Sequence, residues 1–286
     1  MTELKYKFTK DTLFKILFVK YPELLKRLVA ALLGIEFESI VKFSITNPEL
    51  TPEELGRKFC RLDIYMIVDD KHVNIEVQVT DEGNFLERTL FYLSRAYSTS
   101  IDEGKNFSQL PPTIAINILG FELFDCKEFH SEYKLLEVTR HTHLTDKLVI
   151  HFYELVKLPP LKDGDSGRDL WLQLFNAQTE EDLTKIESLG VSFMSEAIVA
   201  YRHVATSPEF REAERMRSKA RYDEAQALHN AEQRGAETER QHWQVVVADV
   251  VAEKDTVIAE KDTVIANQAT ENEKLRAQLE QFQAKA

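Results

Sequence analysis

Two neighbouring segments of the chain alternate between hydrophobic and polar residues, a pattern that predicts half-buried β-strands. The first segment covers residues 60–68 and the second residues 73–79, with the polar stretch 69–72 between them. This arrangement predicts a β-hairpin. The side chains on its apolar face are Cys60, Leu62, Ile64, Met66 and Val68 in the first strand and Val73, Ile75, Val77 and Val79 in the second.

The opposite face of this hairpin carries polar residues. A turn of two or four residues would pair Val68 with Val73 and place Asp63 across from Gln78. Glu76 would then lie diagonal to Asp63, within side-chain reach. A turn of three residues would instead direct the polar side chains of one strand to the other face. The first register predicts a patch of carboxyl and amide groups, and the second register separates them.

Hydrophobic residues at steps of three and four predict helices on both sides of the hairpin. Residues 11–20 have a broad apolar face, and a second helix begins at Pro22 and ends at Gly34. Residues 85–103 form the clearest helix, which Gly104 closes. Its predicted apolar face carries Leu86, Leu90, Leu93 and Tyr97, and its other face carries Arg88, Tyr92 and Arg95.

Four further strands complete the predicted core, over residues 37–45, 113–119, 131–139 and 147–155. The first alternates like an edge strand. Residues 113–119 are almost entirely apolar, which is typical of a central strand that is buried on both faces. The last two strands are predicted to be neighbours. This order of helices and strands predicts an α/β fold in which a mixed sheet is flanked by helices.

The C-terminal part of the chain is predicted to be helical. Residues 168–206 form amphipathic helices, and Pro208 begins a long charged helix in which Glu253–Ala259 recurs as Glu260–Ala266. A period of seven residues is typical of a coiled coil. One register places Val251, Ile258, Ile265, Asn272 and Leu279 at the a positions and Val247, Lys254, Lys261, Gln268, Leu275 and Phe282 at the d positions.

The lysines in the d row weaken this coiled coil, so we expect marginal self-association, as a homo-oligomer that is most simply a dimer. Asn272 at an a position would fix the register of the two helices. The alternative is a single helix that frays in water. The predicted domains are a core over residues 1–160, a helical appendage over 161–206 and the charged helix over 207–286.

Composition favours a globular, cytoplasmic protein. The chain is 43% hydrophobic, and its only cysteines, Cys60 and Cys126, are expected to be reduced. The opening residues lack the form of a signal peptide. The most apolar early stretch, residues 24–35, contains Lys26 and Arg27 and is too short to span a bilayer. We therefore expect no membrane segment.

Two carboxylates that share a patch repel each other unless a proton or a cation lies between them. Oxygen ligands suit a hard divalent ion such as Mg²⁺ or Mn²⁺, which can activate a water and stabilise charge on a phosphoryl oxygen. Asp63 and Glu76 are therefore candidate metal ligands. In the alternative interpretation they face solvent on a surface hairpin, or pair with Arg61 and Arg88.

Several motifs in this order and at these distances resemble the Rpn family of recombination-promoting nucleases and transposases, a branch of the PD-(D/E)XK nuclease superfamily. The resemblance covers about residues 10–158. The motifs that carry it are Asp11-Thr12-Leu13-Phe14-Lys15, Leu62-Asp63-Ile64, Ile75-Glu76-Val77-Gln78, Arg88 with Tyr92, Ile114-Ala115-Ile116-Asn117-Ile118-Leu119 and Phe152-Tyr153-Glu154-Leu155-Val156-Lys157.

This resemblance implies a restriction-endonuclease-like fold in which Asp63 and Glu76 bind Mg²⁺ or Mn²⁺. The Val77 backbone would add a further oxygen. Gln78 stands at the position of the motif lysine, although the Glu-x-Gln form is common in the family. Glutamine is neutral and can only hydrogen-bond, so Lys15 or Lys58 is a candidate for the missing charge.

By the same resemblance Asp11 is a further candidate metal ligand, and an aspartate there is equally typical of a helix N-terminus. Arg88 and Tyr92 lie one turn apart on the predicted helix, where both can meet the same phosphate, and Lys15 is a third candidate. Arg88 can equally pair with Glu76. These assignments imply a metal-dependent DNA endonuclease that acts in recombination or in defence against mobile elements.

Net charge is the main objection to a nuclease. The chain carries −12 at pH 7 and lacks the general attraction for phosphate that most DNA-binding proteins have. Binding of DNA would therefore need a local basic patch, for which Arg88, Arg95, Lys105, Lys10 and Lys15 are candidates. The competing interpretation is a nuclease-like scaffold that has lost catalysis and acts through its coiled coil, and an RNA-directed nuclease is a third.

Overall fold

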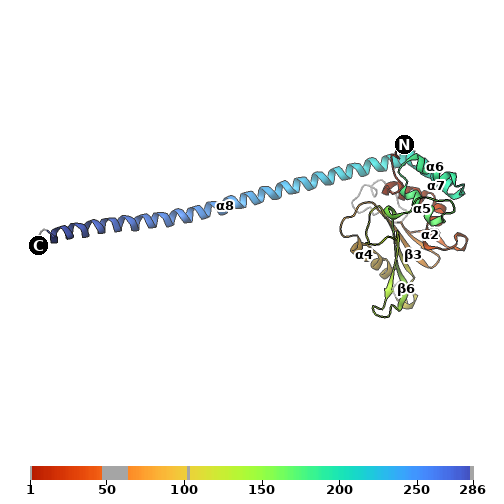
Figure 1. Cartoon of the computed structure of the whole chain (residues 1–286), viewed down its shortest axis with the longest axis horizontal. Coiled ribbons are helices and arrows are strands. Elements are labelled where there is room, and N and C mark those ends of the chain that lie inside the picture. The colour runs from red at the N-terminus through yellow and green to blue at the C-terminus, as the bar shows by residue number, and fades with distance from the viewer. Residues whose placement is uncertain (1, 47–63, 102–103, 284–286) are drawn as a thin grey trace. The chain divides into compact units, whose positions relative to one another are not determined.

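The computed structural model describes residues 2–46, 64–101 and 104–283 of the 286-residue chain (Figure 1). The chain divides into two compact units, Met1–Ala220 and Arg221–Ala286. The first unit contains a six-stranded sheet and the helices that cover both of its faces.

The sheet is mixed, with strand order β1-β2-β3-β4-β6-β5. Strand β2 is antiparallel to both β1 and β3, the strands β3, β4 and β6 run parallel to one another, and β5 is antiparallel to β6 at the far edge. This arrangement confirms the predicted α/β fold. The strands are β1 (Phe43–Ile45), β2 (Ile64–Val68), β3 (Lys71–Gln78), β4 (Thr113–Leu119), β5 (His130–Leu136) and β6 (His143–Glu154).

One face of the sheet is covered by a large core that joins helices from both ends of the first unit. Phe14, Leu17, Trp171 and Phe175 are all buried in it together with the strand residue Ile116. The helices of residues 168–206 therefore share one core with the N-terminal helices. They are α1 (Asp11–Lys20), α2 (Pro22–Leu33), α5 (Gly167–Asn176), α6 (Glu180–Ser188) and α7 (Ser192–Thr206).

The opposite face is covered by α4 (Phe85–Ser98), and Figure 1 shows α4 and α2 on opposite sides of the sheet. Phe85 and Leu93 of this helix pack in a smaller core. The predicted apolar face of α4 is wrong in part, because Leu86 and Leu90 are 40% and 54% exposed. The helix instead turns Thr89 toward the sheet, since this sheet face is itself polar at its centre.

The hairpin register differs from the predicted one by two residues. Val68 pairs with Lys71 rather than with Val73, so the turn is Asp69-Asp70. Asp69 adopts a left-handed conformation with φ 55°. Its Oδ1 accepts hydrogen bonds from the backbone N–H groups of Val41 and Lys42, each at 2.9 Å, which stabilises the turn at this position. A shift of two residues keeps every side chain on its predicted face.

Several predicted boundaries are also wrong, among them the end of β5, at Leu136 rather than 139, and the start of β6, at His143 rather than 147. Residues 37–45 are not one strand, because Phe37–Ser39 form a 3-10 turn and only Phe43–Ile45 pair with β2. Helix α4 ends at Ser98, and its last carbonyl groups accept hydrogen bonds from the hydroxyls of Thr99 and Ser100.

Helix α8 covers Pro208–Gln283, as the start at Pro208 predicts. Its first residues belong to the main core, where Phe210 is fully buried and Ala213 is 3% exposed. In the second unit the apolar side chains of the seven-residue repeat, such as Ile258 and Ile265, are exposed. Among the described residues, no helix is long and apolar enough to cross a membrane.

Candidate active site

The candidate site lies on the face of the sheet that α4 covers. Along β3, Val73, Ile75 and Val77 point into the large core, so His72, Asn74, Glu76 and Gln78 point to the other face. Strand β4 runs parallel beside β3 and pairs Glu76 with Asn117. Glu76 is only 8% exposed, which is unusual for a carboxylate unless it is paired.

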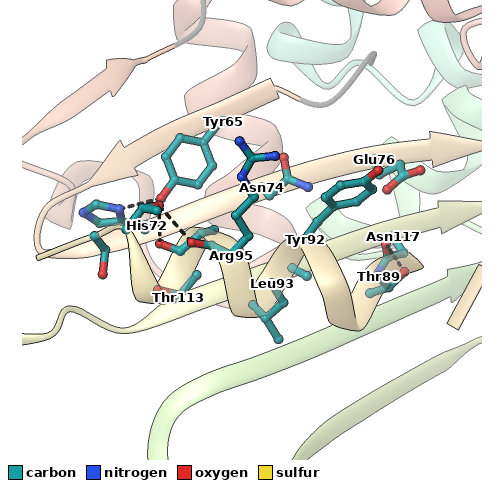
Figure 2. A pocket seen from close by; sticks show the side chains of 14 residues that line it. Tyr65, His72, Asn74, Glu76, Thr89, Tyr92, Leu93, Arg95, Thr113 and Asn117 are labelled. Carbon is teal, nitrogen blue, oxygen red and sulfur yellow. Dashed lines mark hydrogen bonds between the residues drawn. The ribbon is translucent and has the colours of Figure 1, made fainter. Parts of the chain in front are cut away.

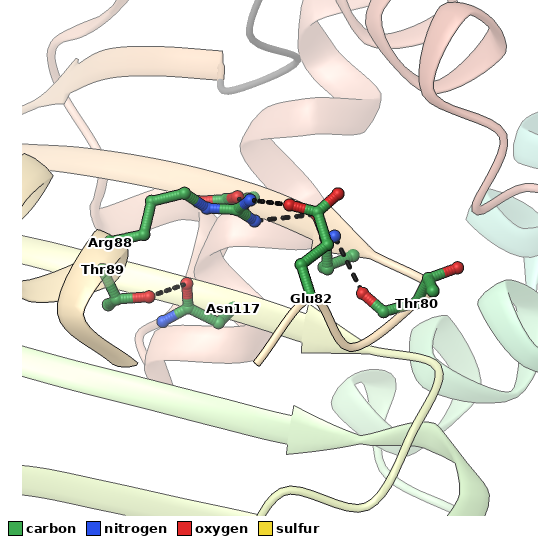
Figure 3. Close-up of polar contacts among 7 residues, drawn as sticks. Thr80, Glu82, Arg88, Thr89 and Asn117 are labelled. Atoms are coloured by element: carbon green, nitrogen blue, oxygen red, sulfur yellow. Dashed lines mark hydrogen bonds and ion pairs between the residues drawn. The ribbon is translucent and has the colours of Figure 1, made fainter. Parts of the chain in front are cut away.

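Arg88 of α4 supplies the cation that Glu76 needs. Its Nη2 donates to Glu76 Oε1 at 2.8 Å and to Gln78 Oε1 at 2.9 Å, and its Nη1 donates to Glu82 Oε2 at 3.0 Å. Figure 3 shows the guanidinium reaching Glu82 across this site. One guanidinium thus joins three acceptors, and it also lies 5.0 Å from the centre of the Phe85 ring. Burial makes these charge-assisted bonds stronger than they would be in water.

Gln78 has both ends of its amide engaged. Its Oε1 accepts from Arg88, and its Nε2 donates to the backbone carbonyl of Thr80 at 2.9 Å. The side chain is therefore fixed beside Glu76. A neutral amide held in this way brings no positive charge to the position of the motif lysine.

Asn117 of β4, the strand next to β3, is a buried amide that pairs with Glu76 in the sheet. Asn117 is 1% exposed, and its Nδ2 donates to the backbone carbonyl of His151 at 3.1 Å. The hydroxyl of Thr89 lies 3.5 Å from Asn117 Oδ1, at the limit of a hydrogen bond (Figure 3). The contact between Thr89 and Asn117 joins α4 to β4 at the residue that pairs with Glu76.

A cavity of about 400 Å³ lies between α4 and the strands, with Glu76 at one end of its lining (Figure 2). Tyr92 of α4 points its hydroxyl end toward Glu76 from the opposite wall. The lining residues are Tyr65, His72, Asn74, Glu76, Thr89, Tyr92, Leu93, Arg95, Ala96, Thr99, Ser100, Thr113, Ala115 and Asn117.

The far end of this cavity is formed by a tyrosine–histidine pair. The Tyr65 hydroxyl lies 2.6 Å from His72 Nδ1 (Figure 2). Burial raises the pKa of Tyr65 above its ordinary value and lowers the pKa of His72 below its own. Both groups are therefore neutral at pH 7, and they form a neutral hydrogen bond.

The structure brings together Glu76, Gln78, Arg88 and Tyr92 of the residues that the sequence predicts for the site. Asp63 and Lys58 lie outside the described residues. The side chain of Val77 is in the large core, which leaves only its backbone as a ligand, as predicted.

The two predicted residues of α1 have other surroundings. Asp11 forms an ion pair with Arg217 of α8, so its carboxylate is already engaged with a cation. Lys15 is 6% exposed on a helix that packs against α2 and α7. Their roles as metal ligand and as supporting cation stay predictions.

Sequence reasoning misses Glu82, Asn74 and Asn117 as parts of this site. Asn74 could have been found, because it shares the alternating face of Glu76. Asn117 could be recognised only as an isolated polar residue in an apolar strand. Its position next to Glu76 depends on the pairing of β3 with β4, which the sequence does not specify.

The donor groups here fit a hard divalent cation only in part. Glu76 offers a carboxylate, and oxygen donors are the ligands such ions prefer. Within the described parts of the chain, no group of three or more His, Cys, Asp and Glu side chains is placed to hold a metal ion. Glu82 is a second carboxylate near Glu76, but it is bound to Arg88, and the predicted second ligand, Asp63, lies outside the described residues.

Comparison with known proteins gives one match. No curated protein and no solved structure is recognisably similar to this chain. A sequence model of the PD-(D/E)XK nuclease family transposases matches residues 8–231, well over half of the chain. This match confirms the kinship that the motifs indicate. The chain therefore belongs to the PD-(D/E)XK nuclease family of transposases.

Proposed function

We propose that this protein is a metal-dependent DNA endonuclease that hydrolyses phosphodiester bonds. Family membership supports a nuclease-like function. The observation that carries the proposal is the Glu76 carboxylate, which is nearly buried, held by Arg88 and part of the lining of a cavity. Recombination, or defence against mobile elements, is the setting that the family implies.

Asp63, Glu76 and the Val77 backbone carbonyl would hold Mg²⁺ or Mn²⁺. A bound ion of this kind lowers the pKa of a water and takes up charge on a phosphoryl oxygen. We retain Asp63 as the second carboxylate because the Leu62-Asp63-Ile64 motif is among those that carry the family resemblance.

Arg88 would position Glu76 and Gln78 rather than act alone. Its bond to Glu82 is the weakest of the three, because the Glu82 side chain is 58% exposed and exposed ion pairs contribute little. Arg88 can therefore exchange Glu82 for a substrate phosphate and keep its hold on Glu76. Gln78 would orient the attacking water through its amide, and Tyr92 would contact the substrate strand.

A nicking assay tests this proposal. Supercoiled plasmid is incubated with the full chain in Mg²⁺, in Mn²⁺ or in EDTA, beside the variants Asp63→Asn and Glu76→Gln. Loss of a direct metal ligand is expected to lower the rate by about 100-fold or more, since even outer partners of a metal site cost 10–100-fold. Glu87→Gln, at an exposed position of α4, is the matched control and should cut normally.

Equal nicking by the wild type and both site variants would reject the proposal, because the activity would then come from elsewhere. Nicking that persists in EDTA would reject the dependence of cleavage on a divalent metal ion.

A second candidate function is supported by Gln78. Because its amide already binds Thr80 and Arg88, the site could be a lapsed one in a scaffold that acts by self-association. The same assay separates the two, since a scaffold would show no metal-dependent nicking in any preparation. In either case we propose that the repeat in α8 joins two copies of the chain as a coiled coil.

A further inference from the structure

The cavity beside Glu76 extends well beyond the site of cleavage. Its floor follows β3 from Glu76 through Asn74 to His72, and its wall is formed by α4 from Thr89 onward together with Thr99 and Ser100, which follow the helix. The four residue steps along β3 correspond to roughly 13 Å at the rise of a strand. The proposed cleavage site therefore lies at one end of the cavity, and the Tyr65–His72 pair lies at the other.

Aromatic rings and hydrogen-bonding groups line this space. In Figure 2 the Arg95 guanidinium rises between Tyr65 and Tyr92, next to the amide of Asn74. Among hydrogen bonds and ion pairs within the described residues, neither Arg95 nor Asn74 has a side-chain partner. Rings that can stack thus stand beside one amide and one guanidinium whose polar groups are available to a ligand.

The charge of the lining excludes a phosphate as the main occupant. Of the described residues that line the cavity, Arg95 carries the single positive charge and Glu76 the single negative one. His72 is neutral, because burial lowers its pKa. A phosphate needs several donors with positive charge, whereas this lining suits a neutral, planar group with polar edges. The volume, about 400 Å³, fits a small ligand.

We propose that this cavity receives one unpaired nucleobase of the strand whose phosphodiester lies at Glu76. The inference rests on the proposed function, because that function places a DNA strand at Glu76, at one end of the cavity. A base that is stacked and paired within a duplex cannot enter such a space. The substrate class is therefore DNA with an unpaired nucleotide next to the bond that is cut, such as a bulge, a mismatch or a single-stranded end.

Each lining group has a role in this arrangement. The ring of Tyr92, nearest to Glu76, stacks on the base, and Tyr65 closes the far end. Arg95 and Asn74 donate to the polar edge of the base. Since they read edges that all four bases share in part, we expect a preference for an unpaired base rather than for one sequence.

Binding without metal tests the cavity separately from cleavage. Fluorescence anisotropy in EDTA compares three duplexes, namely one with a single-nucleotide bulge, one with the same bulge lacking its base, and one fully paired. The bulge that retains its base is expected to bind roughly 10-fold more tightly than the other two, the value of stacking one base on an aromatic ring. Equal affinity for the two bulges would overturn the proposal.

Two variants of α4 test whether the preference for the unpaired base arises in the cavity. Ala96→Trp fills the cavity and should abolish the preference, whereas Ser94→Trp places the same ring at an exposed position and should retain it. Retention of the preference by a folded Ala96→Trp protein would overturn the proposal. Folding of each variant is checked by circular dichroism.

Photocrosslinking of the wild type gives a result that does not depend on any variant. With 5-iodouracil at the bulge, the crosslinked peptide should contain Tyr65, His72 or Tyr92, and crosslinks confined to other regions would overturn the proposal. Base preference and these crosslinks without metal-dependent nicking would refute the endonuclease and keep the cavity assignment. Metal-dependent nicking without base preference would support the endonuclease and overturn the cavity assignment.

Discussion

Arg88 determines how Glu76 is held. A carboxylate that is 8% exposed is stable in its ionised form only when cations and hydrogen-bond donors surround it, and Arg88 supplies both. The same guanidinium fixes Gln78 at 2.9 Å. The geometry of the site therefore depends on an α4 residue that, on our proposal, also binds the substrate phosphate.

The dependence of Glu76 on Arg88 is measurable as a coupling energy. Arg88→Met keeps an unbranched side chain and removes the guanidinium, which lies over the Phe85 ring. We expect a loss of about 2 kcal/mol in the free energy of unfolding, below the range for fully buried pairs because Arg88 retains some exposure. In a Glu76→Gln background the loss should be smaller by about 1 kcal/mol or more.

Urea denaturation of the four proteins measures this cycle. The same cost of Arg88→Met in both backgrounds would show that the two side chains do not interact and would remove Arg88 from the site.

Residue identity predicts part of the site, and pairing between distant segments decides the rest. Glu76 and Gln78 are predicted to share a face because residues i and i+2 of a strand always do. Arg88 follows soon after them in the sequence, so its return to the same patch is also predictable. The position of Asn117 beside Glu76 is not predictable. It depends on the register between β3 and the parallel strand β4, and a hydrophobic pattern does not reveal that register.

At the scale of elements, local signals explain both the accurate and the wrong predictions. Helix α2 begins at Pro22 and ends before Gly34, which has φ 67°, because a proline and a left-handed glycine define those ends directly. The bounds of β4 agree as well, since Thr113–Leu119 is apolar apart from its first residue and Asn117. The hairpin register fails because Asp69, rather than a glycine, adopts the left-handed turn conformation.

Strands β5 and β6 carry a pair of histidines that makes stability depend on pH. His151 Nδ1 lies 3.0 Å from His130 Nε2, and burial lowers the pKa of His151 from 6.5 to about 4. The folded state thus favours neutral His151, whereas the unfolded chain takes up a proton below about pH 6.5. Stability is fully present above that pH and is lost as the pH falls toward 4.

We expect the free energy of unfolding to fall by up to about 3 kcal/mol over this window through His151. Urea denaturation at several pH values between 7 and 4.5 measures the slope. His151→Gln should flatten it, and His141→Gln, at an exposed turn, should not. If His151→Gln leaves the slope unchanged, the buried imidazole is not its source.

At the scale of the whole molecule, the two compact units differ in what can stabilise them. Residues of the first unit bury a continuous core that includes Phe210 and Ala213. The second unit is a helix whose apolar side chains are exposed, and such helices are stable in water mainly when they pack against a partner. A truncation that removes the second unit should therefore follow Ala220, because a cut at Thr206 would take Phe210 out of the core.

Self-association through the repeat is tested in the full chain. Ile258→Lys with Ile265→Lys places charges at two predicted a positions and should convert a dimer to a monomer, as seen by size-exclusion chromatography with light scattering. Thr256→Lys with Thr263→Lys changes the outer side of the same helix and should leave the dimer intact. A dimer that survives the isoleucine changes, or a wild type that is already monomeric, would contradict the coiled coil.

The claim on which the account depends most is that Asp63 and Glu76 hold one divalent ion. Fe²⁺ bound in place of Mg²⁺, with ascorbate and hydrogen peroxide, cleaves the protein backbone close to the ion, and mass spectrometry locates the cuts. We expect cuts next to residues 63 and 76–78 that excess Mg²⁺ suppresses and that Glu76→Gln abolishes. Cuts confined to other regions, or unchanged by that substitution, would contradict the account.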